Sequence, residues 1–407
     1  MSREEGTDGS KEGIDLAAAL RFVVLLGFVS MFADATYESS RSITGPYLAT
    51  LGAGAAIVGI VAGLSELADY GLRFLSGYLT DRTRKYWLIA FIGFGLNMAA
   101  VPLLALAVRW ELAAALILAE RTGKAIRNPA RDTMLSYATR AFGHGRSFGL
   151  QEALGQVGAV VGPLVVAALL HFRYSYRFCL SVLVVPAVAT LGVLIFARKS
   201  FPHPDRFEAR SAGSPSGSWL PPSFWLFLAV VALMASGYVD YPLIAFHFRK
   251  SGAIPGSWIP AFYAVAMATD AVAALAFGHF FDQKGITVLL MACLVSSLAA
   301  PLALWGGFSL AMLGMALWGV GLGAQKAILK AAIVGMVPSE RRGTAYGLYN
   351  AAYGVSWFLG SSLMGWLYGR SPAALAGLSV TAELAAVPLI LLVARMQVAA
   401  DAAIAQD

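Results

Sequence analysis

Six ionisable side chains interrupt long apolar stretches of this sequence. An ionisable group at the centre of a bilayer costs about 2.5–3.5 kcal/mol on insertion scales, so it normally faces the protein interior and has a partner. Three of the six are acids, which can bind a proton, and three are bases, which can pair with an acid or an anionic ligand. The six are Asp34, Glu38, Arg121, Lys124, Asp240 and Lys326. Because Asp34 and Glu38 are four residues apart, they share one face of a helix.

A second set of charges leaves two interpretations open. Glu66, Asp69 and Arg73 are spaced i, i+3 and i+7 and form a single polar stripe on a helix. Asp69 either neutralises Arg73, one turn further on, or serves as a proton site. Glu152 and Asp270 also lie within apolar stretches and complete the set of secondary candidates.

The amino-acid composition indicates that these charges lie in a membrane protein. Of the 407 residues, 58% are hydrophobic and 13% charged, and the mean hydropathy is +0.69. Soluble domains carry about 25% charged residues, so the chain is an integral membrane protein. The net charge of +7 is explained by basic residues on the cytoplasmic side of a membrane protein, and we expect no nucleic-acid partner.

Several classes of chemistry are excluded by missing motifs. The two cysteines, Cys179 and Cys293, both lie in apolar runs and offer neither a disulfide scaffold nor a zinc site. No phosphate-binding loop or dinucleotide-binding turn is present, so no nucleotide drives this protein. The scattered histidines lack metal-ligand spacing. We therefore expect no cofactor, no metal and no enzymatic activity.

The charges must be positioned by membrane-spanning helices. About 20 residues cross the hydrocarbon core, and breaks at Gly, Pro and charge clusters delimit twelve candidate spans. They are 16–44, 54–80, 86–108, 112–136, 145–170, 175–197, 221–248, 258–281, 286–305, 308–336, 343–368 and 373–395. We predict an all-α membrane protein with twelve transmembrane helices.

A polar linker divides the chain into two halves. The segment after the sixth span is rich in basic residues, Pro, Ser and Gly, and cannot bury enough apolar surface to form a packed domain. The predicted organisation is an N-terminal tail at 1–15, a six-helix half at 16–197, a linker at 198–220, a second six-helix half at 221–396 and a C-terminal tail at 397–407.

The distribution of Lys and Arg predicts the orientation. With both termini in the cytoplasm, the cytoplasmic side receives most of the basic residues, and the opposite side receives few, among them Arg41. The positive-inside rule therefore places both tails and the linker in the cytoplasm. The start of the chain is acidic and polar and lacks the basic region of a signal peptide.

The two halves are diverged copies of each other. The same offset of 201 residues separates Asp69 from Asp270, Gly77 from Gly278 and Asp81 from Asp282. The tripeptide KAI, which begins at Lys124, recurs at Lys326 with nearly the same offset. Such internal similarity is typical of secondary transporters.

These repeated residues resemble a known family. The segment GYLTDRTRK, from Gly77 to Lys85, is similar to the loop motif between helices two and three of the major facilitator superfamily, and GHFFDQKG, from Gly278, is similar to its second copy. The first copy lacks the Gly expected after Thr83. The resemblance implies two pseudo-symmetric six-helix halves, with helices 1, 4, 7 and 10 lining a central cavity. It also implies that the loop residues control the conformation. These residues are Gly77, Asp81, Arg82, Gly278 and Asp282.

Two further segments resemble the drug/proton antiporters of that superfamily. Arg121 occupies the position of their helix-four arginine, although Ala125 replaces the glycine that follows it. The segment GAVVGP, with Gly158, Gly162 and Pro163, resembles their helix-five signature. Close helix packing explains the two glycines equally well, because small residues at i and i+4 let membrane helices approach.

The residues and the resemblance together favour a secondary active transporter of the bacterial inner membrane. We expect a monomer that moves a small organic solute by alternating access, by proton-coupled efflux, with Asp34 as the coupling carboxylate and Arg121 and Lys124 as its counter-charges. Alternatively, Asp34 and Arg121 form a purely structural pair. Lys124 and Lys326, facing each other, suggest uptake or exchange of an organic anion as the second function, and a membrane-embedded enzyme is a remote third.

Overall fold

The computed structural model describes residues 16–138, 144–203, 220–337 and 342–404, and within these ranges the regular secondary structure is entirely helical. The first half has six spans, the sixth of which consists of two helices. Its elements are α1 (Leu16–Thr50), α2 (Ala55–Thr83), α3 (Tyr86–Leu103) with the short η1 (Leu104–Leu106), α4 (Trp110–Ala138), α5 (His144–His171), α6 (Tyr176–Val182) and α7 (Val184–Ser200).

The second half repeats this pattern with more interruptions. Its elements are α8 (Pro222–Gly237), α9 (Tyr241–Ser251), η4 (Gly256–Trp258), α10 (Ile259–Lys284), η5 (Gly285–Thr287), α11 (Val288–Ser297), α12 (Ala299–Trp305), α13 (Phe308–Met336), α14 (Arg342–Arg370) and α15 (Pro372–Ile404). Each of the twelve predicted spans corresponds to one of these helices or to a consecutive pair, so the predicted fold class is confirmed.

Ten of the described spans are long and apolar enough to cross a membrane by composition alone. The two that are not among them are α4 and α14. The charges of α4, which include Glu120, Arg121 and Lys124, lower its hydropathy, and α14 is rich in Gly, Ser and Tyr. Polar spans of this kind are tolerated where they face the protein interior.

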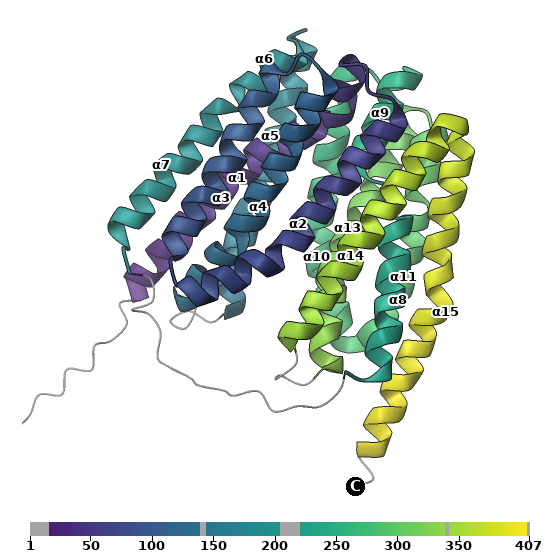
Figure 1. Cartoon of the computed structure of the whole chain (residues 1–407). Helices are drawn as coiled ribbons and strands as arrows, with labels where there is room; N and C mark the ends of the chain where they lie inside the picture. The colour runs from purple at the N-terminus through teal and green to yellow at the C-terminus, as the bar shows by residue number, and fades with distance from the viewer. Residues whose placement is uncertain (1–15, 139–143, 204–219, 338–341, 405–407) are drawn as a thin grey trace, which may run out of the picture.

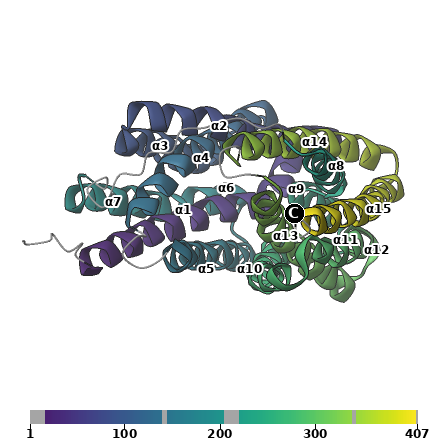
Figure 2. The same ribbon diagram turned by 90° about the horizontal axis from the view of Figure 1, so that it is seen from below.

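The halves stand side by side and touch along a few helices (Figures 1 and 2). Helix α2 runs beside α14 and α5 runs beside α10, while α1 also meets α9. Within the first half, α1 packs closely on α5. Gly158 and Gly162 lie in that contact, where an added Cβ would collide with the backbone of Met31 and Ala35. The helix-five glycines are therefore required for packing, which was one of the two interpretations of their motif.

The seventh span is broken, whereas the sequence predicted one continuous helix over 221–248. Helix α8 ends at Gly237, α9 begins at Tyr241, and Asp240 is the extended residue that precedes α9. Pro242 explains the break, because it has no N–H to bond the carbonyl four residues earlier. At the end of α8, the hydroxyl of Ser379 in α15 donates to the carbonyl of Gly237 at 2.6 Å.

Two helices also extend beyond the ends that the sequence predicted. Helix α7 continues to Ser200, past the expected start of the linker at 198, and α15 continues to Ile404, past the expected start of the tail at 397. Most of the linker and the whole N-terminal tail lie outside the described residues.

Candidate functional site

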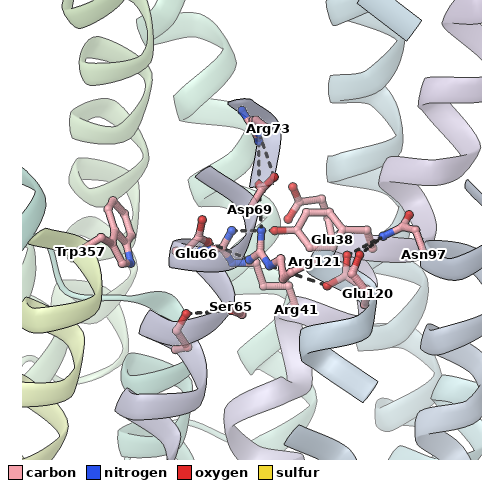
Figure 3. Close-up of polar contacts among 12 residues, drawn as sticks. Glu38, Arg41, Ser65, Glu66, Asp69, Arg73, Asn97, Glu120, Arg121 and Trp357 are labelled. Atoms are coloured by element: carbon pink, nitrogen blue, oxygen red, sulfur yellow. Dashed lines mark hydrogen bonds and ion pairs between the residues drawn. The ribbon is translucent and has the colours of Figure 1, made fainter. Parts of the chain in front are cut away.

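A network of buried charges occupies the first half at the level of the helix break (Figure 3). Glu66 of α2 lies between two guanidinium groups, with its Oε1 2.8 Å from Nη2 of Arg121 and 3.1 Å from Nη2 of Arg41. The side chains of Arg121 and Glu66 are only 5% and 8% exposed. Because removing one partner of a buried ion pair leaves an uncompensated charge, Glu66 is central to this network.

This geometry corrects the expected pairing of Asp34. Arg121 binds Glu66 and not Asp34, whose nearest guanidinium is that of Arg127, with Nη2 3.5 Å from Oδ1. Arg127 is six residues beyond Arg121, about 9 Å further along α4. Helix α1 runs antiparallel to α4 and places Asp34 at the level of Arg127 along the bundle. The expected structural pair of Asp34 with Arg121 is therefore wrong.

The polar stripe on α2 is partly self-neutralised. Asp69 accepts two hydrogen bonds from Arg73, 2.9 Å from Nε and 2.7 Å from Nη2. This bidentate pair matches the first of the two interpretations of Asp69. Charged hydrogen bonds of this geometry are among the strongest that side chains make.

A second set of contacts joins the two halves beside the break in the seventh span. Arg41 reaches Asp240 at 3.1 Å, and Trp357 of α14 donates to the same carboxylate at 3.0 Å. Tyr263 of α10 donates to Glu38 at 2.5 Å. Asp240 and Glu38 thus hold α1 against the second half.

Arg41 was counted among the basic residues of the non-cytoplasmic side, but α1 continues to Thr50, and the Arg41 side chain is only 12% exposed. The spacing of Arg41 from Asp34 and Glu38 in the sequence already indicated that it belongs to this cluster. Asp34, Glu38 and Arg41 follow i, i+4 and i+7, which places all three on one helix face.

A cavity of about 280 Å³ lies between the halves at the end that carries the α2–α3 turn. Thirteen of its sixteen lining residues are polar or charged. Of the sequence-predicted candidates it brings together Asp34, Glu38, Arg73, Lys124, Glu152 and Lys326. Arg121, Glu66, Asp69, Asp240 and Asp270 lie outside its lining.

The two repeated lysines share this cavity but have different partners. Lys326 binds Asp270 at 2.9 Å. Nζ of Lys124 lies 3.9 Å from the centre of the Tyr37 ring, and no described carboxylate lies within 4.0 Å of it. Lys124 is therefore a partly buried cation that lies against an aromatic face, a contact worth about 0.5–2 kcal/mol depending on how far the cation is desolvated.

The loop-motif residues have few contacts that can be described. Gly77 lies in α2, 3.8 Å (measured from a Cβ placed on it) from Pro129 of α4, and the exposed Arg82 donates to the Tyr78 hydroxyl at 3.3 Å. The side chains of Asp81 and Asp282 lie outside the described part, and Gly278 has open space around it. A conformational role for this motif remains a prediction.

Three buried charged residues, Glu120, Arg127 and Glu383, were missed as candidates. Arg127 was assigned to the cytoplasmic side, yet it is 0% exposed. Glu383 of α15 is 1% exposed and accepts a hydrogen bond from Ser296 at 3.0 Å. The signal for Glu383 was present in the sequence, since it is an isolated acid within the apolar run 373–395.

Two six-helix halves around a polar, charged cavity define a membrane transporter. The family model of the Major Facilitator Superfamily matches residues 23–361. An uncharacterized protein of Mycobacterium tuberculosis is 39% identical over 379 residues, which cover 92% of this chain and 93% of that one. An uncharacterized MFS-type transporter of Methanocaldococcus jannaschii is 28% identical, over 86% of this chain and 89% of that one. The crystal structure of the nucleoside transporter NupG superposes with a TM-score of 0.69 at 17% identity and covers 92% of this chain and 98% of that one.

The chain belongs to the Major Facilitator Superfamily. It is a multi-pass membrane transporter and not an enzyme.

Proposed function

We propose that this protein is a proton-coupled secondary transporter that carries a small, polar organic solute by alternating access. The observation that carries this proposal is the 280 Å³ cavity, which is lined almost entirely by polar side chains and contains both Asp34 and Lys124. Burying a large apolar drug there would strip water from these groups without replacing their hydrogen bonds. A polar solute can form hydrogen bonds with these side chains in place of the water that it displaces.

The arrangement of contacts supports an inward-facing state. The cavity lies at the end expected in the cytoplasm. Beyond it, the halves are joined by Arg41 with Asp240 and by Glu38 with Tyr263. The Tyr241 hydroxyl, which donates to the Ile259 carbonyl at 2.7 Å, lies 3.3 Å from the Ser42 carbonyl. Opening the outer end requires that α1 separate from α9 and α10. Alternation of the two ends would move the solute.

Asp34 is the strongest candidate for the proton site. Its side chain is 24% exposed and lies at the cavity wall, so a proton can reach it, whereas Glu66 and Asp69 are covered. Its single ion-pair partner among the described residues, Arg127, is on another helix. Movement of α1 relative to α4 would change that distance, and with it the affinity of Asp34 for a proton.

Two directions of transport are proposed. Efflux by proton antiport is favoured by the helix-four and helix-five resemblances. Uptake or exchange of an organic anion is favoured by Lys124 and Lys330, which line the cavity and have no carboxylate within 4.0 Å among the described residues.

Purified protein in liposomes tests the proposal. Radiolabelled small polar solutes of each charge are loaded inside or outside, with and without a pH gradient across the membrane. At least one should move faster than in protein-free vesicles and respond to the gradient. Movement unaffected by pH would leave a facilitator and remove the proton from the mechanism.

The orientation yields a labelling prediction. We propose that both termini lie in the cytoplasm of a bacterial cell, with the protein in its inner membrane. Lys85 lies in the α2–α3 turn and Tyr174 between α5 and α6, and both are exposed. On intact cells, a membrane-impermeant maleimide should label Tyr174→Cys but reach Lys85→Cys only after lysis. The parent protein is the control, because Cys179 and Cys293 are buried. The reverse pattern would contradict the orientation.

The contact between Arg41 and Asp240 yields a second prediction. Asp240→Asn should weaken the closed outer end, because it removes the only charge of the second half that Arg41 contacts within the described residues. Ser42, which is 0% exposed beside this contact, reports the opening as Ser42→Cys. Maleimide should modify it about tenfold faster, corresponding to about 1.4 kcal/mol. Asp132→Asn is the control, since Asp132 pairs with its neighbour Arg131. Equal rates would show that this pair does not hold the outer end closed.

A further inference from the structure

Arg127 is a buried cation with unused hydrogen-bonding capacity. Its guanidinium group lies between the Phe94 ring of α3, whose centre is 4.6 Å away, and Asp34 of α1. Nη2 faces Asp34, whereas Nε and Nη1 are buried and have no hydrogen-bond partner among the described residues. A guanidinium group has five donors in a planar fork that matches an acid group with two oxygens. This one uses its fork for a single 3.5 Å contact.

Asp34 is the only described carboxylate within 4.0 Å of Arg127. Taking a charge out of water costs several kcal/mol unless a counter-charge compensates it. When Asp34 binds a proton, Arg127 loses its counter-charge while remaining fully covered. The protonated state of Asp34 therefore needs a second negative group in the same place.

The side chains around Asp34 include enough cations to bind a second negative group. Helix α4 presents Lys124, Arg127 and Arg131, and Arg131 is paired with Asp132. Helix α1 adds Glu38, which is bound to Tyr263. The other charged residues of the cavity lining are Glu152 of α5, Arg73 of α2, which is bound to Asp69, and Lys326 and Lys330 of α13.

The space beside Asp34 is also kept free. At Gly155 of α5 a Cβ would lie 2.7 Å from Oδ2 of Asp34, so any larger residue would press on the carboxylate. Because residue 155 is a glycine, no side chain at that position presses on the Asp34 carboxylate. The cavity itself, at about 280 Å³, is slightly below the range of drug-sized sites and fits a small molecule.

We propose that the transported solute is a small organic anion whose acid group replaces Asp34 on Arg127, with Lys124 as the second cation, and that Asp34 takes up a proton as the anion binds. This inference rests on the proposed function and names its substrate class. Neutralising Asp34 releases Arg127 for the anion, and an anion on Arg127 withdraws the cation that held Asp34 ionised. The two binding events therefore strengthen each other by the same factor, as linkage requires.

The coupling has a definite sign. A solute and a proton that bind together move in the same direction, so the transport is symport of an anion with a proton. Antiport requires that the two exclude each other, as a cationic solute and a proton would at Asp34. The structure thus favours the second of the two proposed directions.

Chemical rescue tests the site without knowledge of the natural solute. In the purified full-length chain, Asp34→Ala should lower the Tm by about 5 °C or more, because Arg127 is left unpaired. Acetate, whose carboxylate can occupy the vacated position, should restore most of the loss. Acetamide, which has the same shape without the charge, and chloride at equal ionic strength should not. The double variant Asp34→Ala/Arg127→Met should lose the response to acetate.

Proton uptake tests the coupling in the wild-type protein. When pH-matched acetate is added to a weakly buffered sample near pH 7, about one proton should be taken up for each acetate bound, and Asp34→Asn should take up none. If acetate restores the Tm of Asp34→Ala no more than acetamide does, the proposed anion site is wrong. Proton release, or binding without a proton, would overturn the symport. Neither result bears on whether the chain transports solutes, which the liposome experiment decides.

Discussion

Asp34→Asn is expected to abolish transport driven by a pH gradient while solute exchange without a gradient persists. Asparagine has the shape of a protonated aspartate but cannot release a proton. The inward and outward states then no longer differ in proton affinity at this position, and a gradient cannot bias their equilibrium. The measurement is accumulation in liposomes with and without an imposed pH gradient, in parallel with exchange of labelled for unlabelled solute. We expect gradient-driven accumulation to fall to background, with exchange within about threefold of the wild type.

Asp132→Asn is the matched control for this experiment. Asp132 lines the same cavity but is bound to Arg131 on its own helix, 2.8 Å away, so the pair moves as a unit. It should keep its response to the gradient. If Asp34→Asn also keeps it, the proton site lies elsewhere, and Asp69, Glu152 and Asp240 are the next acids to test.

Glu66→Gln is expected to have the largest effect on stability. Glu66 is the shared partner of Arg41 and Arg121, and all three side chains are largely covered. Removing one member of a buried ion pair costs about 3–5 kcal/mol where the remaining charge has no other partner. Arg41 keeps Asp240, but Arg121 loses its 2.8 Å contact and keeps only Glu120 and Asp69 at 3.7 and 3.9 Å. In detergent, the variant should unfold at a clearly lower temperature and elute with a larger aggregated fraction in size-exclusion chromatography.

Two control variants distinguish the loss of the buried charge from a general effect of substitution on stability. Glu111→Gln breaks the pair with Arg109 at the surface, where the side chains are 76% and 46% exposed for Arg109 and Glu111, and such pairs contribute about 0–1 kcal/mol. Glu66→Gln/Arg121→Gln removes both charges of the closest contact and should recover part of the lost stability. If Glu66→Gln unfolds at the same temperature as Glu111→Gln, the network does not stabilise the first half.

The sequence by itself determined the number and class of the helices. Backbone groups in the hydrocarbon core must bond within their own segment, so apolar runs of about 20 residues become helices whatever surrounds them. Even the charge-rich α4 and the interrupted ninth span were found in this way. The pairing of Asp69 with Arg73 was also among the predicted alternatives, because residues four apart on a helix are neighbours before any tertiary structure forms.

The tertiary structure decided which charges meet across helices. Sequence spacing placed Asp34 and Arg121 on suitable helices, but their heights along α1 and α4 depend on how closely those helices and α5 pack. The glycines at 158 and 162 bring α5 against α1, and Gly93 and Gly123 bring α3 against α4. In the packed bundle Asp34 lies beside Arg127, and Arg121 binds Glu66. The same holds for Arg41, whose partner Asp240 lies 199 residues away, at a break in the seventh span. Contacts between helices depend on rotation and translation of whole segments, and the periodicity of one helix contains no information about either.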